Sequence, residues 1–285
     1  MDQKALAQLE GLQRRIAEIG PCVVAFSGGA DSTFLAAVAT RVLGAEHVHC
    51  VTAVSPSLAR SEFEECGTLA DVLGLNWTTV DTDEMERAAY GRNDRDRCFH
   101  CKSALMDALT PIAAEKNATV LLGVNLDDLG DERPGQIAAE ERGALFPMVD
   151  ARLTKADIRN LSREIDIPTW DKPAMACLAS RVPNGIAVTV EVLSRVERAE
   201  SFIRSLGVRG NLRVRHFNGI ACIEVDPEEF PLITKCKEVI TAHLGGLGYE
   251  RVVLDLDGFR SGSLSRIETG FGARLMSRQL QDLLS

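Results

Sequence analysis

Short apolar runs alternate with amphipathic stretches along the first part of the chain. The runs at 21–26, 48–54, 76–80 and 119–124 predict strands, and the stretches at 33–43, 61–73, 101–116 and 155–165 have helical periodicity. Strands and helices that alternate at this spacing predict an α/β fold with a doubly wound parallel sheet. In such folds ligands bind beyond the carboxyl ends of the strands.

The remaining pattern predicts a second, smaller α+β domain. A helix at 191–206 precedes two strands at 212–217 and 220–225, and a helix at 227–244 precedes a last strand at 251–256. Pro168 and Pro173 interrupt the chain between the two patterns. We therefore expect domains at 1–168 and 169–285.

Charge and hydropathy narrow the functional classes. The 285 residues carry a formal net charge of −9, which disfavours a protein that grips long nucleic acid and suits a small anionic substrate bound by a few arginines. No apolar run approaches the roughly 20 residues that span a bilayer. The first 20 residues form a polar, amphipathic pattern unlike a signal peptide. We expect a cytoplasmic protein.

A glycine-containing loop follows the first predicted strand and precedes a helix that we expect to begin near Thr33. Its sequence is Ser27-Gly28-Gly29-Ala30-Asp31-Ser32. Two glycines permit a tight turn, and backbone amides, hydroxyls and a helix N-terminus bind anions. The lysine and glycine spacing of a Walker A loop are absent, so γ-phosphoryl transfer of that type is not expected. The alternative is a simple glycine turn before a helix.

A second polar segment follows the strand at 119–124. We expect it to meet ATP or Mg²⁺ at the same edge of the sheet, since carboxyl ends of parallel strands line the ligand crevice. Its candidate ligand-binding residues are Gly123, Asn125, Asp127 and Asp128. The alternative is a solvated turn.

Cysteines supply the other candidate chemistry. Of the eight, Cys22, Cys50 and Cys222 lie in apolar runs and are expected to be buried, inert thiols. Cys98 and Cys101 form a Cys-x-x-Cys pair that could bind a metal or cluster or form a redox disulfide.

The third cysteine of interest is Cys177, which lies in a proline-flanked segment ahead of Arg181, a candidate anion-binding residue. Three cysteines leave one iron of a [4Fe-4S] cluster open, where exogenous sulfide could bind. The alternative makes Cys177 a small buried helix residue.

Together these motifs resemble the LarE family of PP-loop sulfur transferases, which help to make the nickel-pincer nucleotide cofactor of lactate racemase. The resemblance covers nearly the whole chain and is carried by 27–32, 97–102, 123–128, 133–135 and 172–185. It implies an adenine nucleotide alpha hydrolase-like PP-loop domain that binds ATP and Mg²⁺. The implied substrate is pyridinium-3,5-biscarboxylic acid mononucleotide, whose carboxylates are adenylylated, with release of pyrophosphate, and converted to thiocarboxylates. AMP is the leaving group that a carboxylate otherwise lacks.

Two versions of this family differ in their cysteines. In one, the residue that matches Cys177 gives up its own sulfur and is left as dehydroalanine. In the other, matches to Cys98, Cys101 and Cys177 hold a [4Fe-4S] cluster that carries an extra sulfide. This chain has all three, so we predict the cluster type, with the sacrificial route as the alternative. Cys177 and Asp31 are the predicted catalytic residues.

The second domain offers an anion site. Arg213 and Arg215 lie two apart on a predicted strand, so their side chains share a face and can converge on a phosphate. The resemblance supports both arginines and Glu200 as substrate-binding residues. The alternative is a solvated face.

Three other functions stay open. A PP-loop tRNA thiolation enzyme would explain the cysteines, but the acidic charge and the lack of a basic extension disfavour it. An amidating synthetase would give the cysteines no role, and a nucleotide or redox sensor would not turn over. The resemblance implies a homo-oligomer, a hexamer, and leaves the sulfide source undefined.

Overall fold

The computed structural model describes residues 3–129, 134–173 and 176–260. The chain divides into two compact units, 1–177 and 178–285, and each is described by itself below. We expected the boundary after residue 168. Residues 261–285 of the expected second domain lie outside the described part of the chain.

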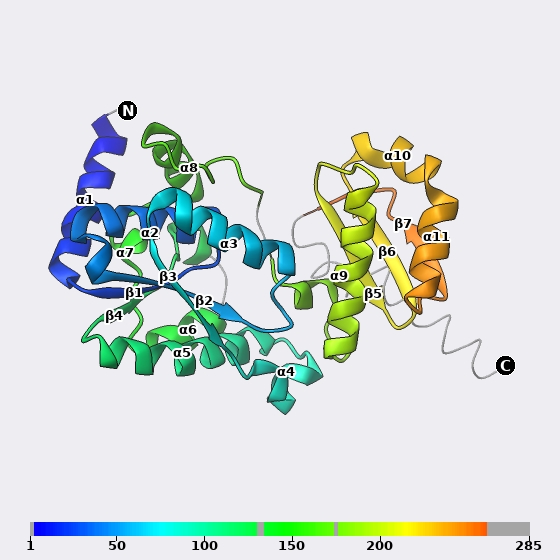
Figure 1. Cartoon of the computed structure of the whole chain (residues 1–285), viewed down its shortest axis with the longest axis horizontal. Coiled ribbons are helices and arrows are strands. Elements are labelled where there is room, and N and C mark those ends of the chain that lie inside the picture. Colours follow the sequence, from blue (N-terminus) through cyan, green and yellow to red (C-terminus); the bar gives the residue numbers. More distant parts are fainter. Residues whose placement is uncertain (1–2, 130–133, 174–175, 261–285) are drawn as a thin grey trace. The chain divides into compact units, whose positions relative to one another are not determined.

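A four-stranded parallel sheet forms the centre of the first unit (Figure 1). Its strands are β1 (Cys22–Ala25), β2 (Val48–Val54), β3 (Asn76–Asp81) and β4 (Thr119–Leu121). Their spatial order is β3-β2-β1-β4, with Cys22 opposite both Val48 and Thr119. The predicted strand 119–124 is shorter in the structure and ends at Leu121, which also forms a parallel bridge with Leu145 through the hydrogen bond from Leu122 N–H to Leu145 O.

Helices cover both faces of this sheet (Figure 1). On one face lie α1 (Gln3–Ile19), α2 (Ala30–Leu43), α3 (Arg60–Leu73), α7 (Pro147–Asp150) and α8 (Lys155–Glu164). On the other lie α5 (Arg97–Glu115) and α6 (Pro134–Glu140), and the short α4 (Ala88–Arg92) contacts α5. The predicted doubly wound α/β fold is confirmed.

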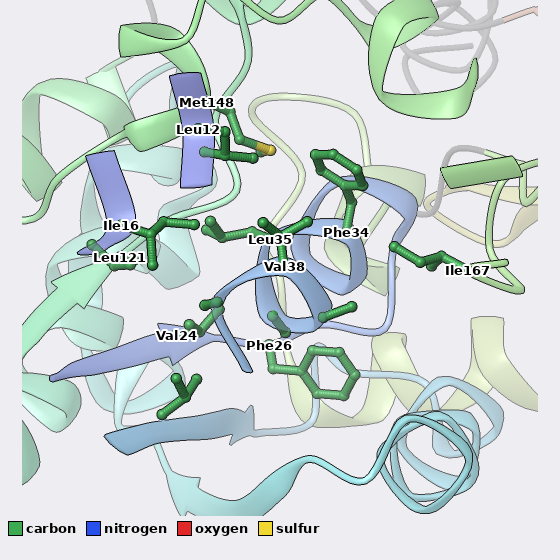
Figure 2. Close-up of a cluster of buried hydrophobic side chains, with 14 of the residues drawn as sticks. Leu12, Ile16, Val24, Phe26, Phe34, Leu35, Val38, Leu121, Met148 and Ile167 are labelled. Carbon is green, nitrogen blue, oxygen red and sulfur yellow. The ribbon is translucent and has the colours of Figure 1, made fainter. Parts of the chain in front are cut away.

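Alternate residues of the central strand supply the two cores of this unit. Val24 packs in the core with α1 and α2, whereas its neighbour Val23 packs in the core with α5. Figure 2 shows the first of these cores, where Phe34 and Leu35 of α2 lie among apolar side chains of α1 and the sheet. Since β1 is buried on both faces, its sequence is a continuous apolar run.

The strand order reverses between β1 and β4. From β1 the chain passes through α2 to β2 and through α3 to β3, on one side of β1, and then returns through α5 to β4 on the other side. In open α/β sheets such a reversal creates the ligand crevice beyond the strand ends. The two segments that leave β1 and β4 therefore face the same crevice, and they are the loop 27–32 and the segment 123–128.

The second unit is a small α+β layer. It contains α9 (Val190–Ser205), β5 (Leu212–Phe217), β6 (Ile220–Val225), α10 (Phe230–Lys235), α11 (Lys237–Gly246) and β7 (Arg251–Leu254). β6 pairs antiparallel with β5 and parallel with β7. The helix predicted at 227–244 is divided in the structure: α10 begins at Phe230, with Pro231 in its first turn, and Cys236 is both the C-cap of α10 and the N-cap of α11.

Among the described residues, no helix is long and apolar enough to cross a bilayer.

Candidate functional site

The loop between β1 and α2 has the framework of an anion site. α2 begins at Ala30, earlier than the sequence predicted, because Gly29 takes the extended N-cap conformation (φ −74°, ψ 162°). The Ser32 hydroxyl donates to Gly29 O at 3.2 Å, accepts from Ser27 N at 3.2 Å and lies 3.0 Å from the Ser27 hydroxyl. No side chain of the described residues caps this helix N-terminus, so its first amides suit an anionic ligand.

Gly28 is required by its conformation and by its surroundings. Its φ is +66°, and a Cβ at this position would lie 3.0 Å from Cys66 Sγ. Any larger residue would therefore be strained and would press the loop against α3.

The end of β4 packs directly against this loop. A Cβ at Gly123 would lie 2.9 Å from Ser32 N, so only glycine allows the backbone of 123–128 to approach the first turn of α2. We expected Gly123 to contact ATP; the structure gives it this packing role as well and places it on the wall of the cavity described below.

The polar residues after Gly123 form a connected network. Asn125 and Asp128 are 0% and 9% exposed, and Asn125 N donates to Asp128 Oδ2 at 3.3 Å. Asp127 is exposed, and its Oδ2 accepts from Lys155 N at 2.7 Å, so it satisfies the N-terminus of α8. A merely solvated turn is therefore wrong for Asn125 and Asp128, and the role shown for Asp127 is structural.

Two carboxylates at this edge, Asp31 and Asp128, are close enough to interact electrostatically. Burial raises the pKa of Asp31, and the charge of Asp128 raises it further, while Lys155 and Arg159 act in the opposite direction. Lys155 Nζ lies 3.0 Å from Asp128 Oδ1. Carboxylate oxygens are hard ligands of the kind that Mg²⁺ prefers, and a divalent cation would relieve the repulsion between Asp31 and Asp128.

A cavity of about 380 Å³ opens above these strand ends, within the 300–1,000 Å³ range of ligand sites. Its wall includes Ser27, Gly29, Asp31, Ser32 and Gly123 of the predicted site. Its apolar part is formed by Ala25, Phe26, Val51, Leu58, Leu105 and Leu122. The cavity therefore combines an apolar surface with an anion-binding loop.

Four cations in the cavity wall were not predicted as ligands. They are Lys102, Lys155, Arg159 and Lys172. Positive charge gathered here, in a chain of net charge −9, favours a polyanionic ligand such as the phosphates of a nucleotide. No motif marks Lys155 or Arg159, which come from α8; only the position of that helix beyond the strand ends could have indicated them.

The Cys-x-x-Cys pair lies in the first turns of α5. This helix begins at Arg97 and not near 101 as predicted, so Cys98 and Cys101 are three residues apart on a helix and lie on one side of it. Cys98 and Cys177 are exposed and Cys101 is partly buried. An inert buried Cys177 is therefore wrong.

The third cysteine lies within electrostatic reach of the pair. Burial raises the pKa of Cys101 to about 12, and the charges of Cys177 and Cys98 also contribute to this increase. Thiolates are the ligands of iron–sulfur clusters, so the donor set suits such a group in kind. Nevertheless, no three His, Cys, Asp or Glu side chains of the described residues are grouped to hold a single metal ion.

Gly135 explains part of the motif at 133–135. A Cβ there would lie 2.9 Å from Cys98 O and 2.8 Å from Lys102 Cγ, so glycine lets α6 approach the turn that carries the cysteine pair. Arg133 of the same motif lies outside the described residues, as do residues 174 and 175 ahead of Cys177.

The four residues predicted to bind substrate belong to the second unit. Arg181 makes a bidentate pair with Glu200, with Nε–Oε1 and Nη2–Oε2 distances of 3.0 and 3.1 Å. Glu200 Oε1 also accepts from Val214 N at 2.9 Å. The carboxylate of Glu200 therefore joins α9 to β5.

Arg213 and Arg215 are only 6% and 5% exposed, so the alternative of a solvated face is wrong. Arg215 donates to Glu224 at 2.8 and 3.0 Å and to Ser180 O at 2.9 Å. The guanidinium of Arg213 lies over the ring of Phe259, and burial, with the charge of Arg181, lowers its pKa to about 10. Sequence spacing did not indicate Glu224, which is fully buried on the neighbouring strand.

Comparison with known proteins agrees with this geometry. The chain is 40% identical over 266 residues to an uncharacterized protein of Synechocystis, covering 92% of this chain and 98% of that protein. It is 35% identical over 261 residues to the pyridinium-3,5-bisthiocarboxylic acid mononucleotide synthase of Lactiplantibacillus plantarum, covering 91% and 92%.

Shorter similarities concern the first unit. Residues 9–108 match the NAD synthase family. A GMP synthase of Bdellovibrio bacteriovorus is 38% identical over 81 residues, 27% of this chain and 16% of that enzyme. The loop-bearing part is thus similar to the NAD synthase family and to a GMP synthase, whereas the similarities to the Synechocystis and Lactiplantibacillus plantarum proteins extend over nearly the whole chain. This chain belongs to the LarE family, that of the pyridinium-3,5-bisthiocarboxylic acid mononucleotide synthases, and its first unit has the PP-loop fold.

Proposed function

We propose that this protein is an ATP-dependent sulfurtransferase that converts pyridinium-3,5-biscarboxylic acid mononucleotide into its bisthiocarboxylic acid, releasing AMP and pyrophosphate. The observation that carries the proposal is the cation-lined cavity at the ends of β1 and β4, in a chain that aligns with a synthase of this name over 91% of its length. The pyridinium acceptor is inferred from the name of that relative, and the use of ATP is inferred from the residues that line the cavity.

The first step is adenylylation. A substrate carboxylate oxygen attacks the α-phosphorus of ATP, and the bond to the bridging oxygen breaks, so that pyrophosphate leaves with the electron pair. The amides at the start of α2 bind the departing phosphates, and Lys155 and Arg159 neutralise their charge. Asp31 and Asp128 are the carboxylates that would hold Mg²⁺, which would supply positive charge for the phosphates, and the apolar part of the cavity receives the adenine.

The second step transfers sulfur. The acyl adenylate is an activated carbonyl, and a sulfide attacks its carbon while AMP leaves, giving the thiocarboxylate. Cys177 is exposed, and the charges of Cys98 and Cys177 both raise the pKa of Cys101. These three thiols are therefore close enough to act together in delivering sulfur. Bound to them, a [4Fe-4S] cluster would supply an open iron on which exogenous sulfide is carried.

Acceptor binding is assigned to the second unit. Arg181, Arg213 and Arg215 gather three guanidinium groups beside Glu200 and Glu224, and the bidentate geometry of a guanidinium suits the phosphate and carboxylates of the acceptor.

Pyrophosphate release tests the proposal. With MgATP, release should depend on added pyridinium-3,5-biscarboxylic acid mononucleotide, and Lys155→Met should lower it at least tenfold. Lys116→Met, a change of an exposed lysine after α5, is the matched control and should leave it unchanged. Release that is independent of the pyridinium substrate, or equal in the two variants, would exclude the assignment. Release stimulated by tRNA instead would favour a tRNA thiolation enzyme.

A further inference from the structure

One lysine outside the PP-loop holds the loop backbone in place. Lys172 Nζ donates to Gly28 O at 2.9 Å and lies 2.8 Å from Glu65 Oε2 and 3.8 Å from Glu62 Oε2. Its side chain is only 10% exposed, although it lines the cavity. A lysine is rarely buried to this extent without a specific partner, and here the partners are a loop carbonyl and two carboxylates of α3.

The position of this lysine is itself fixed. Arg159 Nη2 donates to Lys172 O at 2.6 Å and Arg159 Nη1 to Trp170 O at 3.0 Å. The main chain of 170–172 is thereby tied to α8, and the ammonium group is tied to α3. Lys172 therefore joins two helices to a loop that precedes it by 144 positions in the sequence.

The bond to Gly28 O determines the direction of an amide in the loop. A trans peptide is planar and its C=O and N–H point in opposite directions, so fixing the Gly28 carbonyl also fixes the Gly29 N–H. Gly29 lines the cavity and is the N-cap of α2, where backbone amides bind anions. Gly28 has φ +66° and no Cβ, so the peptide that follows it can rotate more freely than one that follows a residue with a Cβ. An external hydrogen bond therefore restricts this peptide more than it would restrict another.

We infer that Lys172 is a positioning residue for the pyrophosphate part of ATP. It presets the Gly28–Gly29 peptide through its bond to Gly28 O and is held there by Glu65, instead of serving as a phosphate ligand itself. Donors that are fixed before the ligand arrives bind developing charge without a reorganisation cost. This inference rests on the proposal that the PP-loop binds ATP, but not on the sulfur chemistry.

Binding measurements by titration calorimetry test it, with MgATP, inorganic pyrophosphate and AMP as probes. Lys172→Met should lower the affinities for MgATP and for pyrophosphate about tenfold. The affinity for AMP, which lacks the pyrophosphate, should stay within twofold of wild type. Lys172→Arg keeps a donor and a charge and should recover part of the loss. Lys4→Met, which removes an exposed lysine paired with Asp157, is the control and should change none of the three.

Glu65→Gln separates positioning from direct ligation. If Glu65 holds Lys172 on the loop, this variant weakens pyrophosphate binding, by less than Lys172→Met does. If Lys172 were a phosphate ligand, removing its competing carboxylate would tighten binding, and that result would overturn the inference. Equal binding by wild type and Lys172→Met would also overturn it. Tight MgATP binding without thiocarboxylate product would contradict the proposed function alone.

Discussion

Positive side chains gather in both units, around the cavity of the first and within the layer of the second. In the first unit Lys155 is half exposed and its ammonium can turn toward a ligand, although it pairs with Asp128. In the second unit Arg181 and Arg215 are almost fully buried and each is bound by a carboxylate. An anion that enters the second unit must compete with Glu200 or Glu224, whereas phosphates in the first unit meet lysines and backbone amides at little desolvation cost.

The degree of burial separates two uses of positive charge, a structural one in the second unit and a ligand-binding one in the first. Buried bidentate pairs fix the geometry of a strand and leave the guanidinium groups preorganised, but removal of one partner leaves the other as an uncompensated buried charge. Partly exposed lysines contribute little to the stability of the fold, so they can bind a ligand without loss of stability. Substitutions of the buried arginine pairs in the second unit should therefore change the free energy of unfolding most. Substitutions of the cavity lysines in the first unit should mainly change ligand affinity.

The largest effect is expected from Glu224→Gln. It leaves Arg215 buried beside a neutral amide, and breaking such a pair costs about 3–5 kcal/mol of the free energy of unfolding. Denaturant unfolding of the full chain measures this. The double variant Arg215→Met, Glu224→Leu should recover most of the loss, because it removes both charges together. An unfolding curve for Glu224→Gln that overlies wild type would show that the pair is not structural.

A smaller effect is expected at the edge of the first unit. Gly123→Ala places a methyl group 2.9 Å from Ser32 N, and such overpacking costs about 1–3 kcal/mol. Because the displaced segment adjoins the PP-loop, MgATP affinity should also fall, as titration calorimetry can measure. Gly11→Ala is the control: nothing lies within 4 Å of its Cβ position, and in the helix α1 it should be neutral or stabilising.

Asp127→Ala should cost about 1 kcal/mol, the usual contribution of a side-chain cap at a helix N-terminus. Since Asp127 accepts from Lys155 N, the variant should lower the thermal midpoint more than it lowers MgATP affinity. A loss of MgATP affinity of more than a hundredfold with an unchanged midpoint would instead make Asp127 a ligand of the nucleotide or its metal.

The smallest effect is confined to mildly acidic pH. Burial, with the nearby charge of Arg195, lowers the pKa of His216, so the unfolded chain binds its proton first as the pH falls. Stability should be full above about pH 6.5 and fall as the pH decreases toward the lower pKa of the folded state, by no more than about 1.4 kcal/mol per pH unit for one proton. His216→Phe should flatten this part of the profile. An unchanged slope would show that other groups cause it.

Local pattern was sufficient for much of the fold. The strands at 48–54, 212–217 and 220–225 have the predicted bounds, because alternating or continuous apolar residues between turn-forming residues determine them locally. The continuous helix predicted at 227–244 was wrong: Pro231 is compatible with the first turn of α10, and the residues around Cys236 gave no sign of the division there. Sequence patterns of this kind did not show that the strand predicted at 119–124 ends at Leu121, or that Leu121 forms a bridge with Leu145.

The site was predictable only where its residues lie in one short motif. The loop 27–32 and the segment 123–128 could be joined in advance because parallel strands end at one edge. Arg159 could not, because it reaches the cavity from α8, which carries no motif. Lys172 opens the motif 172–185, but that motif does not show its contact with Gly28, 144 positions earlier in the sequence. Glu224 was missed because a lone glutamate on a strand gives no indication of a buried partner.

Product stoichiometry under anaerobic conditions, after reconstitution with iron and sulfide, tests the central claim most directly. Thiocarboxylate formed from the pyridinium mononucleotide with MgATP would be counted per chain in wild type, Cys98→Ala and Cys177→Ala. The account predicts several turnovers for wild type, lost in both variants together with the cluster absorbance. A single turnover that leaves Cys177 as dehydroalanine, with Cys98→Ala still active, would contradict the cluster mechanism in favour of sacrificial sulfur donation.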